Sequence, residues 1–326
     1  MKLNRYISAL LTALALGACS NEGTDTIVIA EGERIDFEVA DASFLTENTR
    51  AVKTTFESTD YFNVIAFANG TIEPLVMSHA QVGKTSNTQL WQTFDHYYWP
   101  KAQTEMTFYA YYPTSLSSKF STLSPPNAPA FTYTVDPTST QEDLLGATTV
   151  YEVNTPNDEN RHVPLSFKHL LCAVCFTVGT NSKYGTFKNI TLKGVNKTGK
   201  YVFGTDTEYW TDLADPVQFS RDIDVEAARP NSTTDTSSSG TAIIPSTSPI
   251  LVVPQVLGEN AKIYIEFIDE NNVTHQLETT PDFKNLKVGT LVNYQLSISS
   301  KFDLSVQTNI ANYTTETYEN INAVME

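Results

Sequence analysis

The chain has 326 residues and a formal net charge of −16, with 21 Lys and Arg against 37 Asp and Glu. This acidic balance has the wrong sign for following phosphate backbones or for attraction to an anionic lipid surface, so nucleic acid is not an expected partner. Only 18% of the residues are charged. Thr, Ser, Asn, Tyr and Phe are plentiful, which favours short strands and turns over helices, and the length allows about two domains.

The first 20 residues have the pattern of an export signal. Cations precede an apolar run from residue 7 to residue 16, and small residues and Cys19 follow it. The run covers about 15 Å as a helix, against about 30 Å of bilayer hydrocarbon, so it is too short for a membrane span. Leu16-Gly17-Ala18-Cys19 resembles the bacterial lipobox, which implies removal of residues 1–18 and acylation of Cys19. An ordinary secretory leader with an incidental Cys19 is the alternative.

A polar tether and a first strand follow the leader. Residues 19–32 are expected to hold a folded domain away from the membrane. Residues 34–39 alternate polar and apolar, which predicts a strand with Ile35, Phe37 and Val39 on one face. After it comes a polar stretch from residue 41 to residue 55.

Apolar and aromatic runs bounded by Gly, Pro and Asn predict the remaining strands. In the first half these are residues 61–67, 91–94, 97–99, 106–112, 144–147 and 163–178. In the second half they are residues 188–192, 201–203, 263–267, 291–298 and 302–306. No stretch sustains a helical period, so we predict an all-β fold of tandem β-sandwich domains. The boundary is expected near residue 180, giving domains 33–180 and 181–326, the second with an acidic tail.

The residue pattern offers no catalytic, cofactor or metal site. The histidines lack metal-ligand spacing, and no nucleophile elbow, phosphate loop or dinucleotide fingerprint is present. Cys172 and Cys175 could form a redox pair or half a zinc site. They lie three apart on an apolar strand and would point to opposite faces, so we interpret them as small buried side chains.

Several short segments follow one another along the chain: Thr49-Arg50-Ala51, Asp60-Tyr61-Phe62-Asn63-Val64, Tyr98-Trp99-Pro100, Phe108 to Pro113, Asp143 to Ala147, Leu165 to Leu171, Leu251 to Gln255 and Val288 to Tyr294. Taken in this order, they resemble the fimbrillins of Bacteroidetes, including the FimA-like and Mfa-like groups. The resemblance implies two Greek-key-like β-sandwich domains in tandem. It also implies a non-enzymatic structural or adhesive subunit of a surface fimbria, carried to the outer membrane as a lipoprotein.

The resemblance further implies assembly by strand exchange. An arginine-directed protease would cut at Arg50-Ala51, residues 33–50 would leave, and a strand of a neighbouring subunit would fill the gap. The departing plug strand would carry Ile35, Phe37 and Val39. An ordinary surface role for Arg50 is the alternative.

The C-terminal part from Phe302 to Tyr318 would supply the donor strand, with Phe302, Leu304 and Val306 as its apolar face. The alternative is that residues 302–306 form the last strand of their own domain. The acidic tail to Glu326 departs from the family pattern.

Two other functions stay open at this point. An uncleaved basal anchor would keep its lipid and bind other fimbrial subunits. A surface glycan-binding lipoprotein would stack sugar rings on Trp91, Trp99 and Trp210, although strand aromatics more often pack in a core. In the fimbrial interpretation the partners are fimbrial subunits, the outer membrane through the lipid, and a host or bacterial surface ligand.

Overall fold

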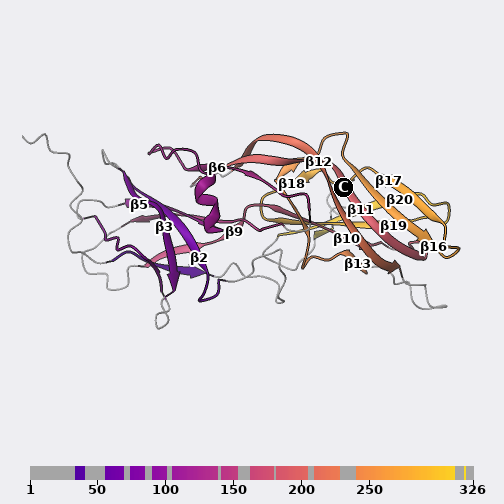
Figure 1. Cartoon of the computed structure of the whole chain (residues 1–326), viewed down its shortest axis with the longest axis horizontal. Helices are drawn as coiled ribbons and strands as arrows, with labels where there is room; N and C mark the ends of the chain where they lie inside the picture. Colours follow the sequence, from indigo (N-terminus) through magenta and orange to yellow (C-terminus); the bar gives the residue numbers. More distant parts are fainter. Residues whose placement is uncertain are drawn as a thin grey trace, which may run out of the picture.

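The computed structural model describes residues 34–40, 56–69, 74–84, 90–100, 105–138, 141–152, 162–179, 181–204, 209–227, 240–312 and 319–320. These residues form strands almost throughout, with one 3-10 helix, η1 (Thr114–Lys119), so the predicted all-β class is confirmed. The molecule is elongated, with N-terminal strands at one end and C-terminal strands at the other (Figure 1). Across the described ranges, no helix is long and apolar enough to cross a membrane.

The first lobe is built on one eight-stranded sheet of order β8-β1-β4-β3-β2-β5-β7-β9. Its strands are β1 (Asp36–Ala40), β2 (Tyr61–Ala68), β3 (Leu75–Lys84), β4 (Trp91–Thr93), β5 (Glu105–Tyr112), β7 (Leu145–Glu152), β8 (His162–Ser166) and β9 (Lys168–His169). The sheet curls so that β7 and β8, which stand near opposite ends of the strand order, come into contact. The Thr149 hydroxyl of β7 donates a hydrogen bond to the Pro164 carbonyl of β8 at 2.7 Å.

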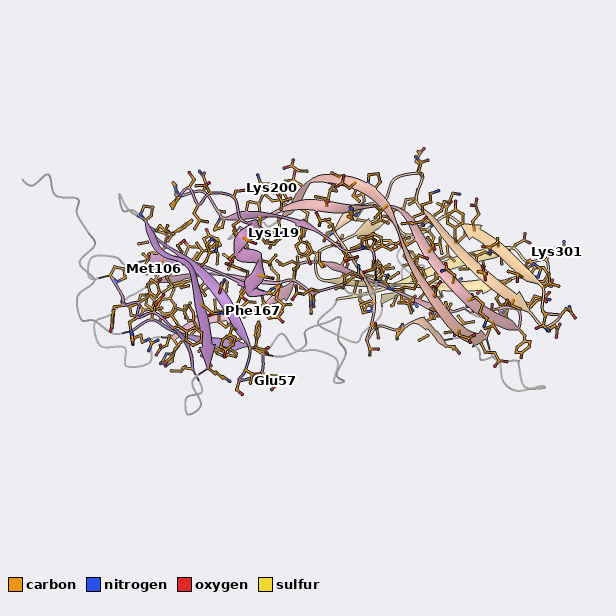
Figure 2. The ribbon with its side chains drawn as sticks, viewed as in Figure 1. Glu57, Met106, Lys119, Phe167, Lys200 and Lys301 are labelled. Atoms are coloured by element: carbon orange, nitrogen blue, oxygen red, sulfur yellow. The ribbon has the colours of Figure 1, made fainter. Side chains whose placement is uncertain are left out.

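The curled sheet encloses an aromatic core. Alternate residues of β2 and β5, such as Phe62 and Phe108, point into this first core, which also holds Met106 and Phe167 (Figure 2). The other face of the same two strands is also buried, and it presents residues such as Tyr111 to a second, larger core. Burial on both faces explains why β2 and β5 are continuous apolar runs in sequence.

The second lobe contains the remaining sheets. One has the order β13-β10-β19-β20-β21 with β14 beside β10, another has the order β12-β11-β16-β17 with β6 beside β11, and β15 pairs with β18. The bounds are β6 (Ala130–Thr134), β10 (Cys172–Val178), β11 (Gly185–Val202), β12 (Tyr209–Ala227), β13 (Ala242–Ile244), β14 (Ile250–Val252), β15 (Gln255–Val256), β16 (Lys262–Asp269), β17 (Thr274–Thr279), β18 (Asn285–Leu286), β19 (Thr290–Ile298), β20 (Leu304–Asn312) and β21 (Glu319–Asn320).

The two lobes share elements across the expected boundary near residue 180. β10 precedes that residue and pairs with β19 of the second lobe, and β6 pairs with β11. Leu116 of η1 and Phe131 of β6 belong to the second core, which joins them to the second-lobe sheets. The chain therefore enters a second-lobe sheet at β6, returns to the first sheet with β7, β8 and β9, and stays in the second-lobe sheets from β10 onward. The division into two domains stays a prediction.

Most predicted strands are present, and the exceptions have a physical cause. Residues 97–99 form only a bridge between Arg34 and Tyr98. Nine strands were not expected, namely β3, β6, β12, β13, β14, β15, β17, β18 and β21. β12 is a 19-residue strand that pairs with β11 alone and is exposed along most of its length. An exposed edge strand needs no apolar alternation. The many acidic residues of β12 therefore left no apolar pattern from which a strand could be predicted.

Candidate assembly site

The first strand, β1, lies inside the first sheet with its apolar face in the core. Ile35 and Phe37 have no exposed surface, and Val39 is partly buried against the same core. Successive side chains of a strand point to opposite faces, so the alternation in sequence accounts for this arrangement. The predicted strand is therefore present and is a structural part of the uncut chain.

Phe37 is the deepest anchor of β1. Its ring centroid lies 6.4 Å from that of Phe62 and 5.9 Å from that of Phe108, with interplanar angles of 79° and 83°. Edge-to-face pairs of this kind add about 0.5–1.5 kcal/mol each beyond the burial of apolar area. The slot that β1 fills thus contains a pocket shaped for an aromatic ring.

The backbone of β1 pairs with strands on both sides. It runs parallel to β8 over five residue pairs, from Asp36↔His162 to Ala40↔Ser166, and antiparallel to β4 over two. The Ile35 N–H also donates to the Tyr97 carbonyl at 2.9 Å. Removal of β1 would leave unpaired backbone groups on both β4 and β8, together with an empty aromatic pocket.

The outer face of β1 is polar and imperfectly paired. Arg34 donates to the Thr93 carbonyl, its Nε lies 3.8 Å from Asp36 Oδ1, and Gln92 donates to Asp36 Oδ2 at 3.3 Å. Within the described ranges, Arg34 Nε, Asp36 Oδ1 and His162 Nδ1 are buried on this face without a hydrogen-bond partner. A buried polar atom without a partner costs about 1–3 kcal/mol, and the 3.8 Å contact between Arg34 and Asp36 offsets part of this cost.

The predicted lipidation and cleavage residues lie outside the described residues. These are Cys19 and the Arg50-Ala51 bond. β1 ends at Ala40, and the described chain resumes at Phe56, whose ring lies 5.6 Å from Phe62 in the first core. The Arg50-Ala51 bond therefore belongs to the connection between two elements that are both anchored in this core.

The predicted donor segment occupies a strand of the chain's own second lobe. Leu304 and Val306 belong to β20, which pairs antiparallel with β19 over nine residue pairs, and both are partly buried against the second core. Phe302 lies in the preceding turn with a φ of 64°, so the strand begins two residues later than expected. Donation of this segment to another subunit stays a prediction.

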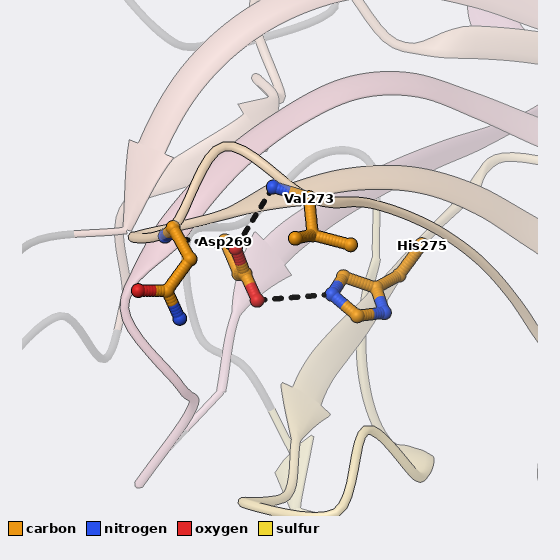
Figure 3. A network of polar contacts seen from close by, with 4 residues as sticks. Asp269, Val273 and His275 are labelled. Carbon is orange, nitrogen blue, oxygen red and sulfur yellow. Dashed lines mark hydrogen bonds and ion pairs between the residues drawn. The ribbon is translucent and has the colours of Figure 1, made fainter.

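The turn before β20 contacts a polar network that the sequence did not indicate. The Phe302 ring stacks on His275 at 3.6 Å between centroids, and Lys183 Nζ lies 4.7 Å from the Phe302 centroid. Asp269 accepts a hydrogen bond from the Val273 N–H at 3.0 Å and contacts His275 Nε2 at 3.1 Å (Figure 3). The Val273 hydrogen bond, with help from His275, holds the pKa of the Asp269 carboxyl below its usual value. This network ties the β16–β17 hairpin to the start of β20.

The cysteine pair is free and buried, as interpreted from the sequence. Both Cys172 and Cys175 lie in the second core without a disulfide. Burial raises the pKa of each thiol to about 12, so neither is a thiolate nucleophile at neutral pH.

The tryptophans do not form a sugar-binding platform. Trp91 and Trp99 are buried in the first core. Trp210 is partly buried, and its indole N–H donates to the Leu170 carbonyl at 2.8 Å. Burial in the core accounts for Trp91 and Trp99, and the hydrogen bond to Leu170 accounts for Trp210, which removes the basis for the glycan platform expected on these rings.

One close acid–base pair, His169 and Asp143, is sealed from solvent. His169 Nδ1 lies 2.6 Å from Asp143 Oδ2, and their side chains are 0% and 2% exposed. A pair buried to this extent cannot reach a substrate, although it can couple β9 to the start of β7. The described segments contain no group of three His, Cys, Asp or Glu that could hold a metal ion.

A shallow groove of about 490 Å³ lies beside β12 and is lined by Arg221, Ser220, Asp222 and Pro137, among others. The Arg221 guanidinium donates to the carbonyls of Pro137 and Ser220 and to the side chain of Gln141. Its bonding joins the loop after β6 to the edge of β12, which is a structural role.

These features define a class of protein: an all-β protein whose first sheet is completed by the short strand β1. The fimbrillin-like family profile matches residues 49–313, and the chain belongs to this family. It is accordingly a structural or adhesive subunit of a fimbria. Among proteins with curated descriptions, no sequence matches significantly.

Three solved structures share the fold. A fimbrial protein from Bacteroides vulgatus superposes with a TM-score of 0.61 at 15% identity, covering 86% of this chain and 99% of that one. A putative cell adhesion protein from Bacteroides ovatus gives 0.56 at 16% identity, covering 88% and 99%. Another from Bacteroides uniformis gives 0.50 at 14% identity, covering 86% and 98%. At these identities the likeness concerns the fold.

Proposed function

We propose that the chain is exported as a lipoprotein through Cys19 and joins a fimbria by exchange of its first strand. The observation that carries the proposal is the place of β1. This strand lies outside the family match, which begins at residue 49 beside the Arg50-Ala51 bond, yet it fills a slot within the matched sheet. A strand that completes the sheet but lies outside the residues matched by the family supports the proposal that β1 is a removable plug.

Hydrolysis of the Arg50-Ala51 bond would change the plug from part of the chain to a bound peptide. The cut by itself breaks no backbone pairing, so β1 would stay in place until a competing strand displaced it. An incoming strand would satisfy the freed backbone groups of β4 and β8 and refill the pocket of Phe37 at the same time. Lipid and plug would leave together, because both lie on the N-terminal side of the cut.

For the donor we propose the segment from Phe302 to Val306 of another subunit. Phe302-Asp303-Leu304-Ser305-Val306 has the same apolar alternation as Ile35-Asp36-Phe37-Glu38-Val39 and an Asp at the same position. Donation requires this segment to leave β19, or to be presented by a subunit whose β20 is not yet paired. The fimbriated form would stand on the outer membrane, with other subunits as partners and a host or bacterial surface ligand for an adhesive member.

The nearest variant of this function is a basal anchor that keeps its lipid. It would use the same fold without a cut at Arg50, with β1 as a permanent strand. The two variants differ in the N-terminal residue of the surface form, which is acylated Cys19 in the anchor and free Ala51 in the processed subunit.

Mass spectrometry of the surface-exposed protein therefore tests the proposal. We expect a mature chain that starts at Ala51 in the fimbrial fraction and a precursor that starts at acylated Cys19 in the membrane fraction. Cys19→Ala should release the protein from the membrane or stall it before maturation. Unchanged fractionation of Cys19→Ala would refute lipidation, and fimbriae built only from chains starting at Cys19 would refute cleavage.

A further inference from the structure

The strand beside β1, β8, depends on β1 for its place in the sheet. All five residues of β8 pair with β1, and in the described part of the chain no other strand pairs with it. On its other side the Thr149 hydroxyl of β7 donates to the Pro164 carbonyl. The contact with β7 therefore lacks the continuous backbone ladder that joins β8 to β1.

Pro164 helps to explain the missing ladder. Proline has no N–H, so the centre of β8 cannot donate to a strand on either side. Apart from β1 and the Thr149 hydrogen bond, β8 is held by Val163 and Leu165, whose side chains are buried in the first core, and by the following strand β9, which pairs with β7. Without β1, the β8 backbone would keep no strand partner among the described residues.

We infer that β1 and β8 form one cooperative unit, so that the slot is a surface that folds as it is occupied rather than a rigid groove. Its occupant is an extended strand of a second fimbrial subunit, running parallel to β8, with a large apolar side chain in the Phe37 pocket. The coupling of β1 to β8 stands by itself, whereas the identity of the occupant rests on the proposed function.

The polar face of β1 indicates which occupant binds more tightly than β1 does. Arg34 Nε and Asp36 Oδ1 are buried without hydrogen-bond partners in the described structure, and the two groups lie 3.8 Å apart. A strand with uncharged side chains at these two positions avoids this desolvation.

Amide hydrogen exchange on the uncut full-length chain tests the coupling. In Phe37→Ala we expect the amides of β1 and β8 to exchange about tenfold faster or more, and in step, because loss of the anchor opens both strands. Strand β5, which is paired on both sides, should keep its protection. Glu38→Ala, on the exposed face of the same strand, is the matched control and should change neither.

Two results would overturn the coupling. In one, β1 opens while β8 stays protected; in the other, β5 opens equally with both. If Phe37→Ala does not fold, Val39→Ala weakens the same strand more gently, because Val39 is only partly buried. The test needs no cleavage in the cell, so it can succeed even where the proposed processing at Arg50 fails.

A peptide experiment tests the occupant. A protease site engineered within residues 41–49 allows the full chain to be nicked and β1 to be displaced by added peptide. The peptide of residues 34–40 should restore the protection of β8, and the same peptide with Ala at the Phe37 position should bind about 100-fold more weakly. A peptide with Gln and Asn in place of Arg34 and Asp36 should bind more tightly than the native one. Equal affinity of the Phe and Ala peptides, or weaker binding of the uncharged peptide, would overturn this account of the slot.

Discussion

Two strands with similar sequence patterns, β1 and β20, differ in how the protein holds them. β1 has a short ladder, with five pairs to β8 and two to β4, and a fully buried aromatic anchor. β20 has a long ladder of nine pairs to β19, and its apolar side chains Leu304 and Val306 are only partly buried. The first combines a shorter ladder with the fully buried side chains of Ile35 and Phe37, and the second combines a longer ladder with partly buried side chains.

The difference in backbone pairing indicates which of the two strands is easier to exchange. Strand replacement must break the ladder before a new one forms, so the shorter ladder of β1 presents the smaller barrier once the chain is cut. The Phe37 pocket then influences which strand can replace β1, because an aromatic side chain makes favourable edge-to-face contacts with Phe62 and Phe108. A similar alternation in two segments thus does not make them equivalent.

The largest effect is expected at the connection after β1. Arg50→Ala should leave precursors lipidated and unpolymerised, because the plug then stays covalently attached. Assembled fimbriae are expected to run on gels as a series of high-mass, SDS-resistant bands. Gel analysis of surface extracts from the variant should show that these bands are lost. Arg229→Ala serves as a control that removes an arginine elsewhere. Fimbriae of normal length from the Arg50 variant would show that β1 is not released by this cut.

The anchor of β1 should have the next largest effect. Phe37→Ala removes a fully buried ring and should lower the free energy of unfolding of the uncut chain by about 3–5 kcal/mol. Denaturant unfolding measures the change, with Glu38→Ala expected to stay within about 0.5 kcal/mol of the parent. A loss below about 1 kcal/mol would mean that β1 is not anchored through its ring.

A smaller loss is expected from the face of β20. Leu304→Ala removes a side chain that is only partly buried, so we expect a loss of about 1–2 kcal/mol under the same conditions. The ladder to β19 should remain, because the substitution leaves the backbone donors and acceptors in place. A loss equal to that of Phe37→Ala would remove the contrast between the two strands.

The smallest effect is expected from the turn network at the start of β20. The folded pKa of Asp269 is lowered, so its contribution to stability is present above the unfolded pKa of about 3.9 and is lost as pH falls through the folded value. Asp269→Asn should therefore reduce stability at pH 6 and flatten its decline below about pH 4. Thermal unfolding across this range measures both, and parallel curves for the two proteins would argue against the network.

Much of the fold could be predicted from local pattern. The alternation of residues 34–39 predicted β1, and the apolar runs predicted β2, β5, β16 and β19, because a buried face imposes a period of two on a strand. The buried cysteines followed from the same geometry. β12 and β17 could not be predicted in this way, since their exposed positions carry no apolar period.

By itself, the sequence determined the all-β class, the order of most strands and the presence of an isolated first strand with one apolar face. Only the tertiary structure decided that this strand lies parallel to β8, that Phe37 enters a pocket from β2 and β5, and that Phe302 belongs to a turn rather than to β20. The physical reason is the distance along the sequence over which the relevant interactions act. Alternation is a property of neighbouring residues, whereas strand direction, register and pocket shape depend on segments more than 100 residues apart, such as Asp36 and His162.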